Sequence, residues 1–239
     1  MLSKEAMEKR QKALQEELQR GYFDDMKDLR DTDGRIGAAP ETISPVSSSI
    51  TFPKMGSCID VYGKDIDIPP QQNAENANES GCLTFLSIAF RSGAQEHLNT
   101  WSDSVASNFA HCPQQIQMIE LGLIDSWVMG LFPFKQTILS NAARLEAEEN
   151  NCEISHHDKP NTNKLRMRQV FRFGDAESFR KSLNLHNKLA AFVFLLDANG
   201  RIRWRMSGPA RQGEELILLD CINMLLSESK TEIVAELKK

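Results

Sequence analysis

Cysteine is scarce in this chain, and its few occurrences are scattered. No two cysteines stand in a Cys-x-x-Cys or zinc-finger spacing, which excludes a dithiol redox motif and a cysteine-based metal finger. An odd number of cysteines without a paired framework favours reduced thiols, as found in the cytosol or an organelle matrix. The positions are Cys58, Cys82, Cys112, Cys152 and Cys221.

Long apolar runs and the common catalytic motifs are also missing. A membrane-spanning helix needs about 18 or more apolar residues in succession, and the nearest approach is Leu121 to Leu139. Two charges and a proline interrupt that run, at Asp125, Pro133 and Lys135. The sequence has no phosphate-binding glycine loop, no Gly-x-Ser-x-Gly elbow and no His-Glu-x-x-His. A formal net charge of −5 disfavours nucleic acid as a partner.

The segment from Lys188 to Gly208 has the pattern of a complete β-hairpin. Phe192 to Leu196 is a continuous apolar run, typical of a strand that is buried on both faces. Asn199-Gly200 is a favourable pair for a tight turn, and arginines then alternate with apolar residues, as in a half-exposed strand. Apolar residues at helical spacing predict a helix over 213–226.

The segments before this hairpin complete a mixed α/β order. A strand over 81–90 feeds a helix over 94–109, so a crossover connection follows. The other expected elements are a hairpin over 51–68, a strand over 115–123, a helix over 124–145 that Pro133 interrupts, and a short helix over 176–185. This order predicts a thioredoxin-like α/β fold in its peroxiredoxin-related form, with a central sheet and flanking helices. An unrelated α/β sandwich with the same order of elements is the alternative.

The loop that carries catalysis in thioredoxin-like enzymes lacks the necessary residues. Such enzymes place the attacking cysteine after the first core strand, where a helix N-terminus lowers the thiol pKa. Here that loop runs from Phe90 to Gln95 and contains no cysteine. The facing cis-proline has no counterpart either, because Leu189, Ala190 and Ala191 stand before the hairpin. The sequence therefore indicates a binding protein, not an enzyme.

Two cysteine-based alternatives stay open at this point. A thiol peroxidase or disulfide reductase could use a displaced cysteine, Cys112 or Cys82. A copper-delivery protein of the same fold would need paired cysteines and a distant histidine, and only the histidine, His186, is present. Cys152 and His156-His157 are ligand types, but they lie in a polar segment, so we expect neither metal nor cofactor there.

The chain divides into two expected parts. Residues 1–49 should form a charged helix over 2–18 and an extended connector, and residues 50–230 should form the thioredoxin-like domain. Polar insertions near 69–80 and 146–164 are expected as surface loops. The apolar stripe of the first helix is too narrow for that helix to fold alone, so it should dock on the domain or on a partner.

Several short motifs carry a resemblance to a known family. They are Arg20-Gly21-Tyr22-Phe23 followed by a charged stretch, Phe52-Pro53, Asn187-Lys188, Phe192-Val-Phe-Leu-Leu-Asp197, Gly200-Arg201-Ile202-Arg203-Trp204 and Ser207-Gly208. Together they resemble the mitochondrial ATP synthase assembly factor 10 proteins, chaperones of ATP synthase subunit 6. The resemblance covers about Leu18 to Leu226.

This resemblance implies a thioredoxin-like protein without catalysis or cofactor. Its partners would be newly made subunit 6 and the assembly intermediate that contains it, and it would promote their joining to the subunit 9 ring. Its place would be peripheral, on the matrix side of the inner mitochondrial membrane. Met1 to Arg10 contains Glu5 and Glu8, unlike an acid-poor transit segment, so the expected localisation rests on the resemblance alone.

A chaperone for a membrane subunit needs an apolar surface that is partly open. The candidate is a stretch of aromatic and methionine side chains, which adapt to varied partners. Its members are Trp127, Met129, Leu131, Phe132 and Phe134. The alternative is a core helix with a proline kink. Tyr22 and Phe23 are further candidate anchors.

A second candidate surface is the arginine-bearing strand of the hairpin. The alternation of Arg201, Arg203 and Arg205 would place three guanidinium groups on one face, suited to acidic loops or anionic headgroups. A solvated strand face is the alternative. Trp204 has the opposite phase, so we expect it in the core.

Overall fold

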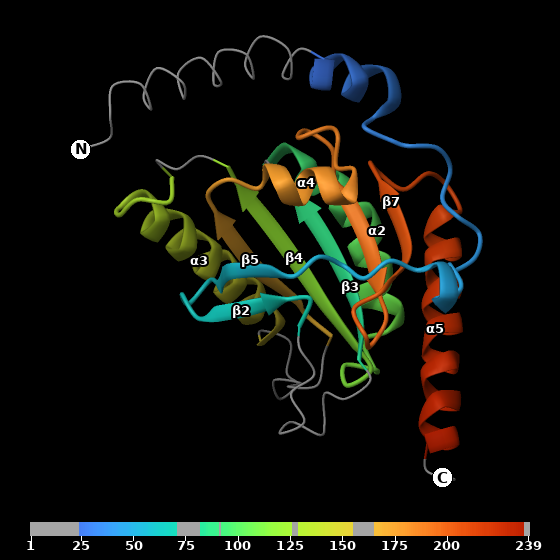
Figure 1. Ribbon diagram of the computed structural model, residues 1–239. Coiled ribbons are helices and arrows are strands. Elements are labelled where there is room, and N and C mark those ends of the chain that lie inside the picture. Colours follow the sequence, from blue (N-terminus) through green and yellow to red (C-terminus); the bar gives the residue numbers. More distant parts are fainter. Residues whose placement is uncertain (1–23, 71–81, 91, 126–128, 155–164, 237–239) are drawn as a thin grey trace.

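The centre of the molecule is a seven-stranded sheet with the order β2-β1-β5-β4-β3-β6-β7 (Figure 1). The computed structural model describes the chain except residues 1–23, 71–81, 91, 126–128, 155–164 and 237–239. The strands are β1 (Met55–Asp60), β2 (Asp65–Ile68), β3 (Leu83–Ala89), β4 (Ile116–Ile124), β5 (Met167–Phe173), β6 (Phe192–Leu196) and β7 (Ile202–Ser207). The helices are η1 (Val46–Ser48), η2 (Ser92–Ala94), α2 (Gln95–Asn108), α3 (Phe134–Ile154), α4 (Glu177–Leu183) and α5 (Glu214–Glu236).

Four neighbouring strands form a thioredoxin-like core. β3 and β4 are parallel and connected by α2, while β6 lies antiparallel on the other side of β3 and continues into β7. The strand order β4-β3-β6-β7, followed by α5, confirms the predicted fold. The position of the turn is confirmed, but of the pair Asn199-Gly200, expected to supply two residues with positive φ, only Gly200 has one, at 71°. The turn spans Asp197 to Gly200, and a carboxylate oxygen of Asp197 accepts the backbone N–H groups of Asn199 and Arg201.

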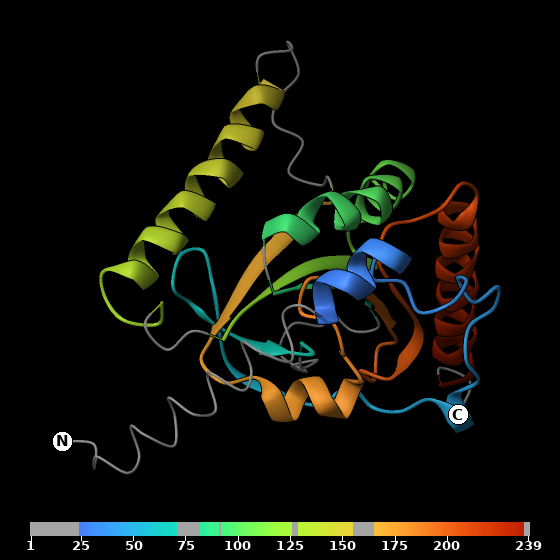
Figure 2. The same ribbon diagram turned by 90° about the horizontal axis from the view of Figure 1, so that it is seen from above.

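Helices cover both faces of the sheet (Figure 2). α4 lies on one face, and α2, α3 and α5 lie on the other. On the α2 side, Trp101 and Trp204 meet edge to face with ring centroids 5.6 Å apart. On the α4 side, Phe52 packs edge to face against both Phe179 and Phe194. All residues of β3 and β6 are buried, as two covered faces require.

β5 is a strand that the sequence pattern does not predict. It runs parallel to β4 and antiparallel to β1, and it joins the first hairpin to the core. Only Val170 of this strand is buried. Arg168 and Arg172 lie two positions before and after Val170, so β5 lacks the continuous apolar run that marks β3 and β6.

The predicted helix over 124–145 is wrong in its bounds. β4 continues to Ile124, and α3 begins at Phe134, directly after Pro133. A proline fits ahead of a first helical turn but not inside a helix, where it would remove a hydrogen bond. α3 then extends to Ile154, so the first part of the insertion over 146–164 is helical and not a loop. The expected helix over 2–18 and most of the insertion over 69–80 lie outside the described residues.

The chain before β1 is fixed to the domain by polar contacts. Residues 24–32 are helical, and the predicted connector then runs beside β7 and α5 (Figure 1). The buried guanidinium of Arg35 donates to Glu214 Oε1 at 2.6 Å and to the carbonyl oxygen of Pro209. The Glu214 carboxylate also accepts the backbone N–H of Ala39 at 3.1 Å. Burial alone would raise the pKa of Glu214, but Arg35 and the amide donors outweigh burial and lower it.

None of the helices among the described residues combines the length and the apolar character needed to cross a bilayer.

Candidate functional site

The nucleophile position of thioredoxin-like enzymes corresponds to the connection between β3 and α2. Phe90 follows β3 directly, packs against the core on the α4 side, and has the Arg180 guanidinium 5.7 Å from its ring centroid. The chain then passes through η2 into α2. Because residues 90–95 include no cysteine, the start of α2 has no thiol to activate.

The facing loop, before β6, is bonded to the helical residues 24–32. The buried amide of Asn187 donates to the Asp25 carbonyl oxygen and to Asp28 Oδ2, both at 2.9 Å. The backbone N–H of Lys188 donates to Asp25 Oδ2 at 3.1 Å, and the Lys188 ammonium pairs with Asp125 at 2.9 Å. Burial raises the pKa of Asp25. The polar groups of this loop are therefore engaged within the protein, which suits a structural role.

The structure describes four cysteines, two of them buried and two half-buried. Burial raises the pKa of Cys58 and of Cys221 to about 11, so both thiols are protonated and weakly nucleophilic at neutral pH. Cys82 and Cys112 are half-buried, one before β3 and one after α2, away from the start of α2. The side chain of Cys152 lies outside the described part. Among the described residues, no group of three or more His, Cys, Asp or Glu is placed to hold a metal ion.

The apolar stretch that leads into α3 and includes its first residue, Phe134, is exposed. The exposed fractions are 42% for Met129, 48% for Leu131, 78% for Phe132 and 49% for Phe134. Single exposed apolar residues are common, whereas several large ones side by side are unusual on the surface of a folded protein. The alternative of a buried core helix is therefore wrong for these four residues, which we call the apolar loop. Three other candidates, Trp127, Tyr22 and Phe23, lie outside the described residues.

The residue after the apolar loop, Lys135 in the first turn of α3, reaches the first of two neighbouring aromatic rings of the sheet. The Lys135 ammonium lies 5.5 Å from the ring centroid of Phe173, and this ring lies 6.5 Å from that of Phe171. Both rings are partly buried. Phe171 lies over Gly122 of β4, where an added Cβ would come within 2.9 Å of the ring. A small residue in β4 thus makes room for an aromatic side chain of β5.

The three arginines of the hairpin do not share one exposed face. Leu195 pairs with Trp204 and Leu196 with Ile202, so Arg203 is an extra residue in the ladder, a β-bulge. A bulge shifts the alternation by one position, and Ile202 and Trp204 accordingly enter different cores. The prediction for Trp204 is confirmed, since it is 2% exposed. The predictions of a half-exposed strand and of an exposed Arg203 are wrong.

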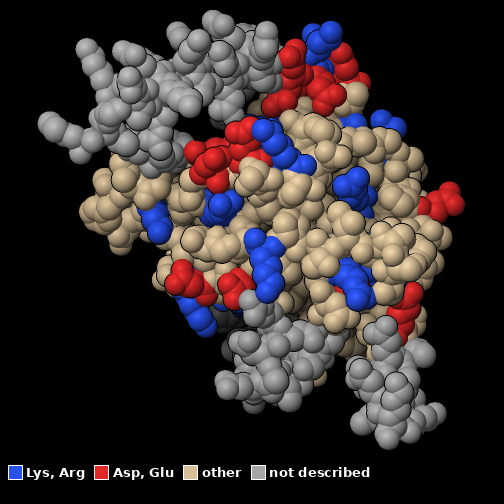
Figure 3. Space-filling view, viewed as in Figure 1, with Lys and Arg blue, Asp and Glu red and all other residues tan. Residues whose placement is uncertain are grey.

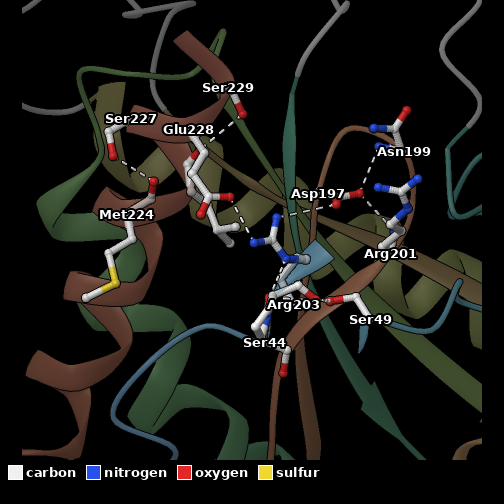
Figure 4. A network of polar contacts seen from close by, with 12 residues as sticks. Ser44, Ser49, Asp197, Asn199, Arg201, Arg203, Met224, Ser227, Glu228 and Ser229 are labelled. Carbon is white, nitrogen blue, oxygen red and sulfur yellow. Dashed lines mark hydrogen bonds and ion pairs between the residues drawn. The ribbon is translucent and has the colours of Figure 1, made fainter. Parts of the chain in front are cut away.

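Arg203 forms a buried polar network instead (Figure 4). It is 3% exposed, and its guanidinium lies 2.8 Å from Glu228 of α5 and 3.6 Å from Asp197 of the hairpin. Its Nε donates to the Ser44 carbonyl oxygen at 2.7 Å, and its own carbonyl oxygen accepts the Ser44 N–H at 2.7 Å. The network joins the hairpin, α5 and the N-terminal segment, which leaves only Arg201 and Arg205 for a partner.

Charges of both signs are mixed on the face shown in Figure 3. Basic and acidic side chains alternate there between broad uncharged areas. Among the described residues of this face, no continuous basic stripe is present of the kind that follows a nucleic acid backbone.

The comparison with protein families gives a match over most of the chain. The family described as ATP10 protein matches residues 1–225. The chain belongs to the ATP10 family. Membership of this family indicates a role in ATP synthase assembly. Such a role is consistent with a connection between β3 and α2 that contains no activated thiol. A search of curated proteins gives no match.

Solved structures similar to this ATP10 protein are remote in sequence. A putative thiol:disulfide interchange protein DsbE from Chlorobium tepidum is 12% identical, with 74% of this chain and 96% of that chain covered and a TM-score of 0.43. BsSco, a member of the Sco family of cytochrome c oxidase assembly proteins, is 10% identical, with 80% and 99% covered and a TM-score of 0.43. A thiol peroxidase from Chromobacterium violaceum is 13% identical, with 82% and 91% covered and a TM-score of 0.40. Sequence identity and structural similarity at this level do not indicate which activity this chain has.

One feature of this ATP10 protein that sequence reasoning missed is the bond between Asn187 and residues 24–32. Both partners belong to the motifs that carried the family resemblance, namely Asn187-Lys188 and the charged stretch after Phe23. The occurrence of both motifs in one sequence was the signal that could have pointed to this contact. Nothing in their composition showed that the two lie in contact.

Proposed function

We propose that this ATP10 protein is a non-catalytic assembly factor that binds newly made ATP synthase subunit 6. In this proposal the apolar loop holds an apolar helix of subunit 6 until that subunit joins the subunit 9 ring. The protein would act as a peripheral protein on the matrix side of the inner mitochondrial membrane. The subunit, the location and the binding residues are parts of the proposal.

The observation that supports it is the exposure of the apolar loop. Phe132 alone is 78% exposed, and full burial of such a side chain contributes about 1.5 to 3 kcal/mol. Several such groups could therefore retain an unassembled apolar helix and release it when a larger partner surface competes. Methionine and phenylalanine suit this task because they do not demand one shape.

The test is a photo-crosslinking experiment in mitochondria that synthesise labelled subunit 6. A photoreactive residue at position 132 should crosslink to subunit 6, whereas the same residue at Leu216 should not. Leu216 is a matched control because it is apolar and 61% exposed but lies on α5. Equal crosslinking from both positions, or none from position 132, would refute binding through the apolar loop.

Substitution gives a second readout. Phe132→Ser together with Phe134→Ser should reduce the capture of subunit 6, while Leu216→Ser should not. Replacement of all five cysteines should leave capture unchanged. A loss confined to the Cys82 or Cys112 variant would instead favour the thiol peroxidase or disulfide reductase alternative.

A further inference from the structure

β7 is an edge strand whose outer side is only partly paired. The Gly208 N–H donates to the Ala191 carbonyl oxygen, and this fixes which residues of β7 face β6. In an antiparallel ladder the bonded pairs alternate, so Met206 and Trp204 bond to β6 while the backbone of Arg205 points away. Among the described residues, neither the N–H nor the carbonyl group of Arg205 has a hydrogen-bond partner.

The N-terminal segment leaves this part of the edge uncovered. It bonds to β7 on both sides of Arg205, through Ser44 to the backbone of Arg203 and through the Ile36 N–H to the Ser207 hydroxyl. Between these two points it turns toward α5, where the Pro40 carbonyl oxygen accepts the indole N–H of Trp204 at 2.8 Å. The segment therefore spans Arg205 without pairing with it.

A hollow of about 280 Å³ lies in this gap. This volume is close to the lower end of small-ligand pockets. Phe192 and Phe194 of β6 line it, together with Leu183 and Leu185 at the end of α4. Ile36 stands at its border and is 61% exposed. The hollow thus offers apolar contact beside an unpaired strand edge.

The charge at the hollow is of one sign. Arg205 is exposed, and within the described part of the chain its guanidinium reaches only the Leu183 carbonyl oxygen, at 3.5 Å. His186 is a further lining residue. None of the described residues that line the hollow is acidic. A ligand with a carboxylate beside an apolar group would complement this arrangement.

We propose that the gap between Ile36 and β7 binds an extended peptide segment that carries an apolar side chain next to a carboxylate. The peptide pairs with the N–H and carbonyl groups of Arg205, its apolar side chain enters the hollow, and its carboxylate meets the Arg205 guanidinium. Strand addition to a free edge uses this combination of backbone bonds and side-chain pockets. The apolar loop lies on the other side of the molecule, near the start of α3 (Figure 1), so this site is independent of the proposed subunit 6 surface.

The test uses defined peptides and the full chain. The probe is the acetylated, amidated pentapeptide Thr-Val-Ile-Val-Glu, compared with its Gln counterpart and with a version N-methylated at the central residue. Decanoate serves as a small carboxylate without a backbone. Binding is followed by two-dimensional amide NMR, which reports the Arg205 N–H directly and also shows that each variant is folded.

The expected result is a shift of the Arg205 amide signal that saturates with the Glu peptide. Replacing Glu by Gln in the peptide, or Arg205→Gln in the protein, should each weaken binding about tenfold, and Ile36→Ser about fivefold. Two matched controls, Arg201→Gln and Ile50→Ser, should stay within about twofold. Ile50 is 55% exposed, and neither control residue lines the hollow.

Three outcomes would overturn the proposal. One is no change at the Arg205 amide at millimolar peptide. Another is equal binding of the N-methylated peptide, which would exclude pairing with the strand edge. The third is binding of decanoate without binding of the peptide, which would assign the hollow to a small amphiphilic carboxylate.

Discussion

Replacing Arg203 by methionine tests whether the buried network holds the hairpin to α5. Methionine keeps an unbranched apolar stem, so the change removes mainly the charge and its bonds. Loss of one partner of a fully buried ion pair costs about 3 to 5 kcal/mol. Here the penalty should be smaller, because Glu228 is 47% exposed and can be hydrated, and Asp197 keeps two backbone donors.

We therefore expect Arg203→Met to lower the free energy of unfolding by about 2 to 3 kcal/mol, a size typical of a charge-assisted bond network. The group most affected is the Ser44 carbonyl oxygen, which loses its 2.7 Å bond from Nε and keeps the longer one, at 3.4 Å, from the Ser49 hydroxyl. Glu228→Gln should cost only about 0 to 1 kcal/mol, because Glu228 is 47% exposed, glutamine still offers an acceptor, and Asp197 remains beside the buried guanidinium. The measurement is urea unfolding at pH 7, followed by tryptophan fluorescence and circular dichroism.

Arg201→Met is the matched control, because Arg201 lies on the same hairpin and joins the network through its backbone N–H, which the substitution leaves in place. It should change the free energy of unfolding by no more than about 0.5 kcal/mol. If Arg203→Met and Arg201→Met have the same effect, the reasoning is refuted. The same holds if Glu228→Gln is as destabilising as Arg203→Met, because the exposed partner would then carry the energy.

Three further expectations concern stability and are all measured by urea unfolding. Trp204→Ala should cost about 3 to 5 kcal/mol through the cavity it leaves, and a wild-type value would contradict its burial at 2% exposure. The pKa of Glu214 is lower in the folded state than its ordinary value of 4.5, so the ionised carboxylate stabilises the fold above pH 4.5. This stabilisation is lost as the pH falls through the folded-state pKa, and Glu214→Gln should remove this part of the pH dependence of the free energy of unfolding. Gly208→Ala should be more destabilising than Gly213→Ala by about 1 kcal/mol or more. Both glycines have positive φ, but a Cβ at position 208 would lie 2.6 Å from the Arg35 side chain, whereas one at position 213 would meet nothing within 4 Å. Equal losses of stability in the two variants would show that the close approach of Arg35 to Gly208 does not matter.

The parts of the fold that the sequence predicted well are those with a strong local signal. β6 is an unbroken apolar run, and a turn ends at Gly200 as its glycine indicates, so the hairpin and the order of the core strands could be predicted. β5 could not, because a strand with one buried residue has no clear alternation. Its place between β1 and β4 depends on long-range pairing that a local pattern does not contain.

The candidate binding surfaces also depend on features that a local sequence pattern does not contain. Exposure of the apolar loop depends on where α3 begins, and only Pro133 gave a sign of that in the sequence. The alternation of Arg201, Arg203 and Arg205 predicted one basic face, but a single bulge at Arg203 separated them. Because the side-chain period of a strand is two residues, one extra residue reverses every face that follows. The open backbone of Arg205 and the buried charge of Arg203 therefore have one cause, the position of the bulge, and a variant that removed it would be expected to change both.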